Sequence, residues 1–265
     1  MPVIKVATFN IGGSRNPEAV RALRRAHDIA IMGLQEVDIN AERSHFHNVA
    51  KQIAGRDAVS AFSESMRFGF LKPNTFTPYK APSHGSAHND ALYGVAIVSR
   101  LPILSQQKIA LGPDEGSYWA LGHDRYAQRE IEPRSAIVAQ LSVEGKPLWA
   151  ISTHTAYTKD RDQPSAVRRS QIDTLFDFID RKIPKEAPLV IMVDCNATRK
   201  NPDLGRLITE FHSPQANTYP VGFDEQPDRQ IDYVFARGLE QCDRPIVIAN
   251  PFVSDHSMMI NSYRL

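Results

Sequence analysis

Val190-Ile191-Met192-Val193-Asp194-Cys195-Asn196 is an apolar run that ends in a carboxylate and an amide. Such a short run, rich in β-branched residues, is typical of a buried strand. Successive side chains of a strand alternate between its faces, so we expect Asp194 and Asn196 on one face and Cys195 on the other, in the packing. The segment therefore predicts a strand that carries two polar groups to one edge of a sheet.

Other apolar segments end in polar side chains in the same way. They are Ile151 to His154, Ala7 to Asn10 and Ile31 to Glu36. Asp232 lies inside the apolar run Ile231 to Val234, and Asp255-His256 precedes the last predicted strand. A buried aspartate needs a partner, and a histidine is a natural one. We expect these strand ends to converge on one rim.

Taken singly, each polar residue also has an ordinary structural explanation. Asp255 suits a turn cap, His154 suits a core histidine bonded to the backbone, and Asp232 suits a structural hydrogen-bond acceptor. Glu36 suits a cap for the next helix, and Asn10 suits a support for the turn at Gly12-Gly13. Their joint occurrence at strand ends favours a site.

Outward from this segment, short aliphatic runs alternate with amphipathic stretches, which predicts a layered α/β domain. Expected strands are 3–10, 29–35, 95–99, 135–143, 148–153, 189–193, 231–236, 246–249 and 258–260, and expected helices are 18–27, 41–54 and 165–182. Two sets, about 1–140 and 141–265, predict two packed mixed sheets inside one domain, 1–265. Each sheet needs cover on both sides, which gives a four-layer sandwich flanked by helices.

Two stretches, 62–89 and 112–130, resist assignment because prolines interrupt any long element. The first mixes aromatic residues with Arg67, Lys72 and Lys80. Long loops of this kind usually carry function or form a substrate rim.

Composition excludes several classes of protein. The chain has 265 residues, 42% of them hydrophobic and 23% charged, which is typical of a globular domain. Its net charge of +1 provides no global field for nucleic acid, so a polyanion needs a local patch. Cys195 and Cys242 are too few for a disulfide scaffold, and no apolar run approaches the roughly 20 residues of a membrane span. Without a signal-peptide pattern at residue 1, we expect a cytoplasmic protein.

The motifs, in this order, resemble the endonuclease/exonuclease/phosphatase (deoxyribonuclease-I-like) superfamily. The resemblance runs from position 8 to 256 and rests on Thr8-Phe9-Asn10-Ile11, Leu34-Gln35-Glu36-Val37, Tyr93 to Arg100, Glu132-Pro133-Arg134, Ser152-Thr153-His154, Val193-Asp194-Cys195-Asn196, Ile231-Asp232-Tyr233 and Ser254-Asp255-His256. The family usually has Gly-Asp-Phe-Asn and Thr-His-Leu where this chain has Val193-Asp194-Cys195-Asn196 and Thr153-His154-Thr155. Neither departure loses a polar group.

The resemblance implies a divalent metal held by Glu36, with Asn10 beside it and Asp255 completing the site directly or through water. Such an oxygen-rich site suits Mg²⁺, with Mn²⁺ and Ca²⁺ as alternatives.

The resemblance also implies roles around the phosphate. Asp194 would orient or deprotonate the attacking water, and Asn196 would hold the phosphate or that water. Asp232 would keep His256 charged, so that the imidazolium meets the negative charge developing on phosphorus. His154 and Arg134 would add phosphate contacts, and Tyr93 lies in a motif whose role varies.

These features predict a monomeric metal-dependent phosphoesterase that hydrolyses phosphodiesters, with nucleic acid as the leading substrate. A nuclease would line its cleft with basic and aromatic residues. Candidates are Arg67, Phe68, Lys72, Lys80, Arg125, Arg129, Arg199 and Lys200, which are otherwise solvated surface residues. The alternatives are hydrolysis of a small molecule or lipid headgroup and, in another class, a binding protein without catalysis.

Overall fold

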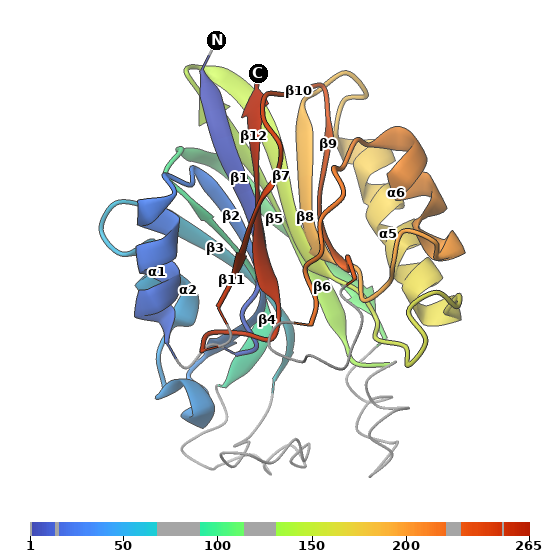
Figure 1. Cartoon of the computed structure of the whole chain (residues 1–265), viewed down its shortest axis with the longest axis horizontal. Coiled ribbons are helices and arrows are strands. Elements are labelled where there is room, and N and C mark those ends of the chain that lie inside the picture. The colour runs from blue at the N-terminus through green and yellow to red at the C-terminus, as the bar shows by residue number, and fades with distance from the viewer. Residues whose placement is uncertain (1, 14–15, 68–90, 114–130, 221–228, 251) are drawn as a thin grey trace.

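The computed structural model describes residues 2–13, 16–67, 91–113, 131–220, 229–250 and 252–265. Two mixed β-sheets lie face to face, with helices outside each (Figure 1). The first sheet has the order β10-β12-β1-β2-β4-β3, with β11 also paired to β12, and the second has the order β5-β6-β7-β8-β9. The strands of the first sheet are β1 (Val3–Asn10), β2 (Ile31–Ile39), β3 (Val59–Arg67), β4 (Leu92–Ser99), β10 (Glu240–Gln241), β11 (Ile246–Ala249) and β12 (Ser257–Arg264). Those of the second are β5 (Ile103–Gly112), β6 (Arg134–Val143), β7 (Lys146–His154), β8 (Leu189–Asp194) and β9 (Asp232–Arg237).

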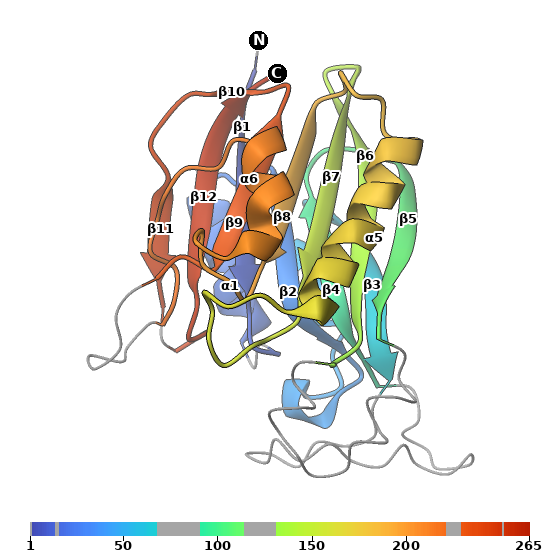
Figure 2. The ribbon, with the colours of Figure 1, turned by 90° about the vertical axis from the view of Figure 1, so that its right-hand side faces the viewer.

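The core follows the alternation expected along β8. Val190 and Met192 pack between the two sheets, whereas Ile191, Val193 and Cys195 pack on the outer face of the second sheet. The helices α5 (Ala166–Lys182) and α6 (Gly205–Glu210) cover that outer face (Figure 2). Cys195 therefore lies in the packing, as the sequence predicted.

The outer face of the first sheet is covered by α1 (Pro17–Ala26) and α2 (Val49–Ala54). Val20 of α1 and Ile53 of α2 share a buried cluster with Phe9 of β1 and Leu34 of β2. Pro17 opens α1 and the Asn16 side chain caps it, because the first turn of a helix has unsatisfied N–H groups. The arrangement confirms the predicted helix–sheet–sheet–helix sandwich.

The chain does not divide between the sheets near residue 140, so that prediction was wrong. Strands β5 and β6 belong to the second sheet, and β12 returns to the first, where it pairs antiparallel with β1 and sets Val3 opposite Arg264. The sequence carries no direct signal for this return, because strand pairing between distant segments leaves no local pattern.

Several elements differ from their predictions, and α6 and β10 were not predicted at all. The expected helix over 41–54 is a 3₁₀ turn, Glu42–Ser44, followed by the short α2. Strand β3 occupies the start of the first unassigned stretch, and β5 was missed because most of its side chains are exposed. The remainder of those stretches, 68–90 and 114–130, lies outside the described residues.

Gly33 is where β2 meets the second sheet most closely. A Cβ added at Gly33 would lie 2.4 Å from the Cβ of Met192, a distance that forces something to shift. We expect Gly33→Ala to lower the free energy of unfolding by about 1–3 kcal/mol, measured by denaturant titration, because overpacking strains a dense core.

Gly205 provides the matched control for that substitution. It opens α6 in helical conformation, with nothing within 4 Å of an added Cβ. Gly205→Ala should therefore leave stability unchanged or raise it by up to about 1 kcal/mol. Equal effects at the two positions would contradict close contact between the sheets.

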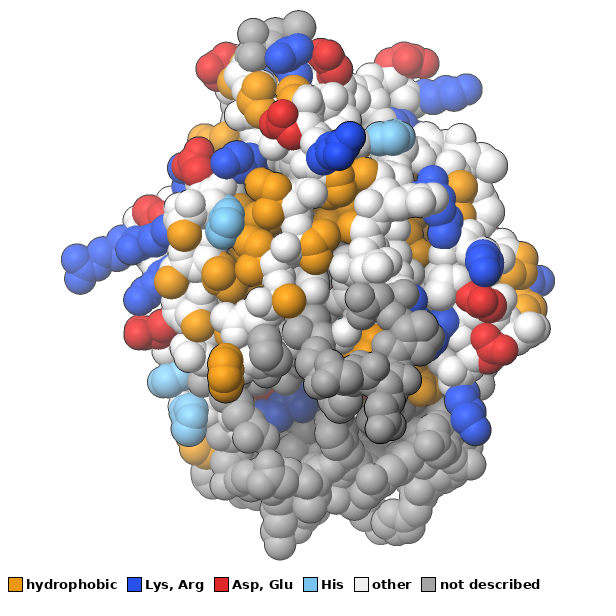
Figure 3. Space-filling model, in the orientation of Figure 1, with side chains coloured by type: hydrophobic (Ala, Val, Ile, Leu, Met, Phe, Trp, Pro, Cys, Tyr) orange, Lys and Arg blue, Asp and Glu red, His pale blue; other side chains and the backbone are white. Residues whose placement is uncertain are grey.

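Hydrophobic side chains gather across the middle of the face shown in Figure 3. Strand β11 crosses this face in Figure 1, and its Ile246 and Val247 are partly exposed. None of the helices in the described ranges combines the length and apolar character required to cross a membrane.

Candidate active site

Three polar residues form one row across the second sheet. His154 ends β7, Asp194 ends β8 and Asp232 begins β9, and β-pairing sets Asp194 beside both of the others. Paired residues of neighbouring strands point to the same face, which for Asp194 is the face shared with Met192, towards the first sheet. Strand register therefore brings together side chains from three distant segments.

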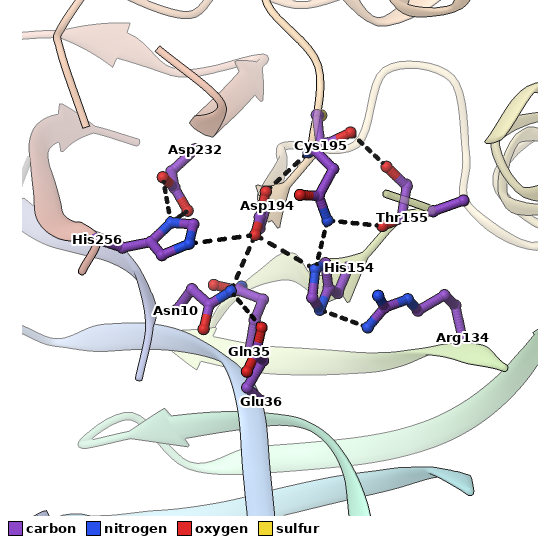
Figure 4. Close-up of polar contacts among 12 residues, drawn as sticks. Asn10, Gln35, Glu36, Arg134, His154, Thr155, Asp194, Cys195, Asp232 and His256 are labelled. Atoms are coloured by element: carbon purple, nitrogen blue, oxygen red, sulfur yellow. Dashed lines mark hydrogen bonds and ion pairs between the residues drawn. The ribbon is translucent and has the colours of Figure 1, made fainter. Parts of the chain in front are cut away.

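Asn10 joins this row to the first sheet. Its Nδ2 donates to Asp194 Oδ2 at 2.9 Å and to Glu36 Oε1 at 3.0 Å (Figure 4). The Oγ of Ser254 donates to the Asn10 carbonyl at 2.7 Å, which ties the segment before β12 to the end of β1. The edge of the two sheets that carries the site is thus built from both sheets and from both ends of the described chain.

A backbone irregularity aims Glu36 into the site. Strict alternation after the inward-facing Gln35 would turn Glu36 away, but the pairing of β2 with β4 shifts register between Leu34 and Val37. Glu36 has φ of 57°, in the left-handed region that a non-glycine residue seldom adopts. A β-bulge of this kind re-aims one side chain, and strain at such a position is common at functional sites.

Asp194 is the centre of the hydrogen-bond network. Besides Asn10, its carboxylate accepts from the Asn196 backbone N–H at 2.7 Å, and His154 Nε2 lies 3.3 Å from Oδ2. Burial works to raise the pKa of Asp194, but its interactions with His154, His256 and Arg161 outweigh burial and lower the pKa. Asp194 is therefore a carboxylate at neutral pH.

His256 is held by Asp232 on the far side of Asp194. Its Nδ1 lies 2.9 Å from Asp232 Oδ2, and its Nε2 lies 3.9 Å from Asp194 Oδ2. Burial works to lower the pKa of His256, but the attraction and hydrogen bond of Asp232 outweigh it and raise the pKa to about 10. The pair therefore presents an imidazolium to the site.

His154 is oriented by a buried arginine. Arg134 Nη1 donates to His154 Nδ1 at 2.8 Å and lies 2.7 Å from Glu132 Oε1 and 3.5 Å from the Tyr93 hydroxyl. An arginine only donates, so Nδ1 is the acceptor of this bond. These contacts fit positioning of His154 by Arg134 better than the phosphate contact implied by the resemblance.

Asn196 stands two residues after Asp194 and has a φ of 49°. Its side chain points back into the site. Its Nδ2 donates to the Thr155 carbonyl at 3.0 Å and lies 2.7 Å from His154 Nε2, while its Oδ1 accepts from Arg161. Arg161 lies in the β7–α5 loop, away from any strand pattern, and nothing in the sequence analysis selected it.

The oxygen donors fit a hard divalent cation. Glu36 is half-buried and Asn10 is buried. The Asn10 amide nitrogen links the carboxylates of Glu36 and Asp194, and the Asn10 oxygen accepts from the Gly12 N–H at 3.0 Å. Mg²⁺ favours such oxygen sets. A second group of ligand-type atoms, from Asp194, Asp232 and His256, lies within 4.8 Å. Two members of that group, Asp232 and His256, are already bonded to each other, which favours the Glu36 carboxylate as a metal ligand.

The remaining predicted residues are less closely engaged. Asp255 is exposed, and the structure gives it no hydrogen bond or ion pair with another described residue. Arg67 lies 3.7 Å from Glu64, Arg199 donates to the Ser213 carbonyl, and Lys200 is exposed. Phe68, Lys72, Lys80, Arg125 and Arg129 lie outside the described residues. Gln35, which bonds across to Ser152 and the Met192 carbonyl, joins the sheets beneath the site.

Solved structures of the same fold include phosphoesterases. An endonuclease/exonuclease/phosphatase from Bacteroides vulgatus has a TM-score of 0.69 at 15% identity, covering 100% of both chains. The mannosyl-6-phosphatase of Bacteroides thetaiotaomicron has a TM-score of 0.65 at 13% identity, covering 99% of this chain and 100% of that one. The human Nocturnin catalytic domain has a TM-score of 0.65 at 16% identity, covering 99% and 93%.

Sequence comparison identifies the family directly. The search of curated proteins found no match. The sequence model of the Endonuclease/Exonuclease/phosphatase family matches residues 7–256, nearly the whole chain and all the strand ends that form the site. The chain belongs to the endonuclease/exonuclease/phosphatase family.

Proposed function

We propose that this protein hydrolyses phosphodiester bonds by attack of water on phosphorus, with nucleic acid as its substrate. The observation that carries the proposal is one buried carboxylate, Asp194, set between two histidines and joined through Asn10 to a second carboxylate, Glu36. Members of the family are generally metal-dependent phosphoesterases, which supports the same reaction class.

Each side chain then has a defined task. The Asp194 carboxylate lies between His154 and His256, where the attacking water would enter. It accepts a hydrogen bond from that water and so orients it towards phosphorus. The imidazolium of His256 stabilises negative charge as it develops on the phosphate oxygens, and Asp232 keeps it charged and in place. Arg134 keeps His154 in the orientation that meets Asp194.

We propose Mg²⁺ as the metal, held by Glu36 and Asn10 and completed by Asp255 directly or through water. When bound, the ion supplies positive charge to the phosphate oxygens. The positive charge of His256, which lies 3.9 Å from Asp194, adds to the positive charge that the ion supplies.

Replacing Glu36 by glutamine tests the metal site. Glu36→Gln keeps the volume and removes a charge, so we expect Mg²⁺ to bind about 10–100-fold more weakly. Activity measured against Mg²⁺ concentration, and calorimetric titration of Mg²⁺, should both show the shift. Glu64→Gln, at a partly exposed position on β3, is the control and should bind Mg²⁺ as the native protein does. Full turnover by the native protein in excess chelator would contradict metal dependence.

A substrate panel tests the reaction class. Purified protein is incubated with single- and double-stranded DNA, RNA, a chromogenic phosphodiester, a phosphomonoester and sphingomyelin, each with Mg²⁺ and with chelator. We expect Mg²⁺-dependent cleavage of the diesters, with nucleic acid cleaved fastest. Failure with every substrate would favour a binding protein built on this scaffold.

A phosphomonoester of a small molecule is the second candidate substrate. It is favoured by the similarity to a structure described as a mannosyl-6-phosphatase, which covers that whole chain. Sugar phosphates in the same panel separate the two, because a monoesterase releases inorganic phosphate from them and leaves polynucleotides intact.

A further inference from the structure

Arg161 is a buried cation beside the proposed site that forms no ion pair with any described residue, although its charge acts on Asp194. Its side chain is only 7% exposed. The other fully buried arginines of the described residues each have a carboxylate within 3.3 Å: Arg24 with Asp57, Arg134 with Glu132 and Arg168 with Asp203. Arg161 has no carboxylate partner among the residues that the structure describes.

The position of Arg161 is fixed by aromatic rings and by Asn196. Its guanidinium lies 4.3 Å from the centre of the Tyr157 ring and 5.6 Å from that of Tyr219. Nη1 donates to both the side-chain and backbone oxygens of Asn196. Tyr219 in turn packs on His256, with ring centres 4.7 Å apart. The cation therefore lies on the side of the site formed by Asn196, Tyr219 and His256.

Burying a charge without a partner is costly, so such a charge is usually paired in the working protein. Cation–π contacts with Tyr157 and Tyr219 offset part of that cost but leave the net charge in place. Glu132 already pairs with Arg134. Of the buried arginines at this site in the described residues, Arg161 is therefore the one without an ion pair, and it can pair with an incoming anion. An anion that enters beside Asn196 would complete the pairing.

We propose that Arg161 is a substrate-binding residue whose guanidinium, seated against Tyr157 and Tyr219, neutralises the substrate phosphate and fixes the Asn196 amide. The inference rests on the proposed function for the identity of the anion, a phosphate ester. It assigns to Arg161 the phosphate contact that the sequence suggested for Arg134. The bond from Arg161 to Oδ1 also fixes the orientation of the Asn196 amide, whose Nδ2 donates to the Thr155 carbonyl.

Binding of inorganic phosphate tests this without turnover. We expect Arg161→Gln to weaken phosphate binding about 10–100-fold by calorimetry, because a charge-assisted hydrogen bond is lost. Arg161→Lys keeps the charge and should recover most of the affinity. Lys159→Gln removes a charge from an exposed position of the same loop and should bind phosphate within about 2-fold of the native protein.

The backbone carbonyl of Arg161 accepts from the Thr198 N–H and the Asn201 side chain and is kept in every variant. The Arg161 side chain also supports Asn196, so a purely structural role of that side chain must be separated. Thermal unfolding and circular dichroism establish that each variant is folded, and in the substrate panel Arg161→Gln should raise KM. Native-like phosphate binding by Arg161→Gln would overturn the inference, as would equal losses in the glutamine and lysine variants. A native protein that binds phosphate through Arg161 but hydrolyses no ester would support the inference while refuting the proposed function.

Discussion

Asp194→Asn is expected to lower kcat by about 10³–10⁴-fold while the protein remains folded. The substitution keeps the shape of the side chain but removes the negative charge that His154 and His256 face. Removing a group that orients a nucleophile or transfers its proton costs rates of this order. Single-turnover kinetics on the best substrate of the panel, at saturating Mg²⁺, measures the effect on the chemical step.

Asp203→Asn is the matched control. Asp203 is a buried aspartate that pairs with Arg168 and Arg169 and makes no direct contact with Asp194, although Arg168 also donates to the Asn196 carbonyl at 3.4 Å. Its replacement should lower stability, because the buried Arg168 loses its counter-charge, yet leave kcat within a few-fold of the native value. Similar kcat losses in both variants would mean that the Asp194 result reports damage to the fold rather than loss of a catalytic group.

The Asp232–His256 pair should behave as one unit. We expect His256→Ala and Asp232→Asn each to lower kcat by about 10²–10⁴-fold, because both changes remove the imidazolium. The double variant should be little slower than either single one, since groups that act together give strongly non-additive losses. Additive losses would show that Asp232 is only a structural acceptor, and the proposed metal site would be unaffected.

The pH profile gives an independent reading of the pair. Asp232 raises the pKa of His256 by favouring its charged form. In Asp232→Asn that support is lost and the pKa falls, so the alkaline limb of kcat/KM should move to lower pH. If the alkaline limb of kcat/KM stayed at the same pH, His256 would not act in its charged form.

The sequence predicted those parts of the site that follow from local strand pattern. Asp194, His154 and Asn10 each end an apolar run, and the structure places all of them at one rim because parallel pairing aligns the ends of β1 with β2 and of β7 with β8. The need of a buried carboxylate for a partner pointed to a histidine, and the family resemblance implied the pairing of Asp232 with His256 that the structure contains.

What the sequence did not predict depends on contacts between distant segments. Alternation alone would turn Glu36 away, and the bulge that redirects it arises from the pairing of β2 with β4. Arg161 lies in a loop without periodicity, where an arginine usually faces solvent. Its importance appears only when the Tyr157 and Tyr219 rings and Asn196 are seen around it.

The return of β12 to the centre of the first sheet has a consequence during synthesis. His256 immediately precedes β12, and Asn10 ends β1, the strand that β12 must pair with. On the ribosome, the proposed site therefore cannot assemble until β12 has emerged and paired with β1. The activity proposed above therefore depends on β12, and a fragment that ends before β12 should show none of it.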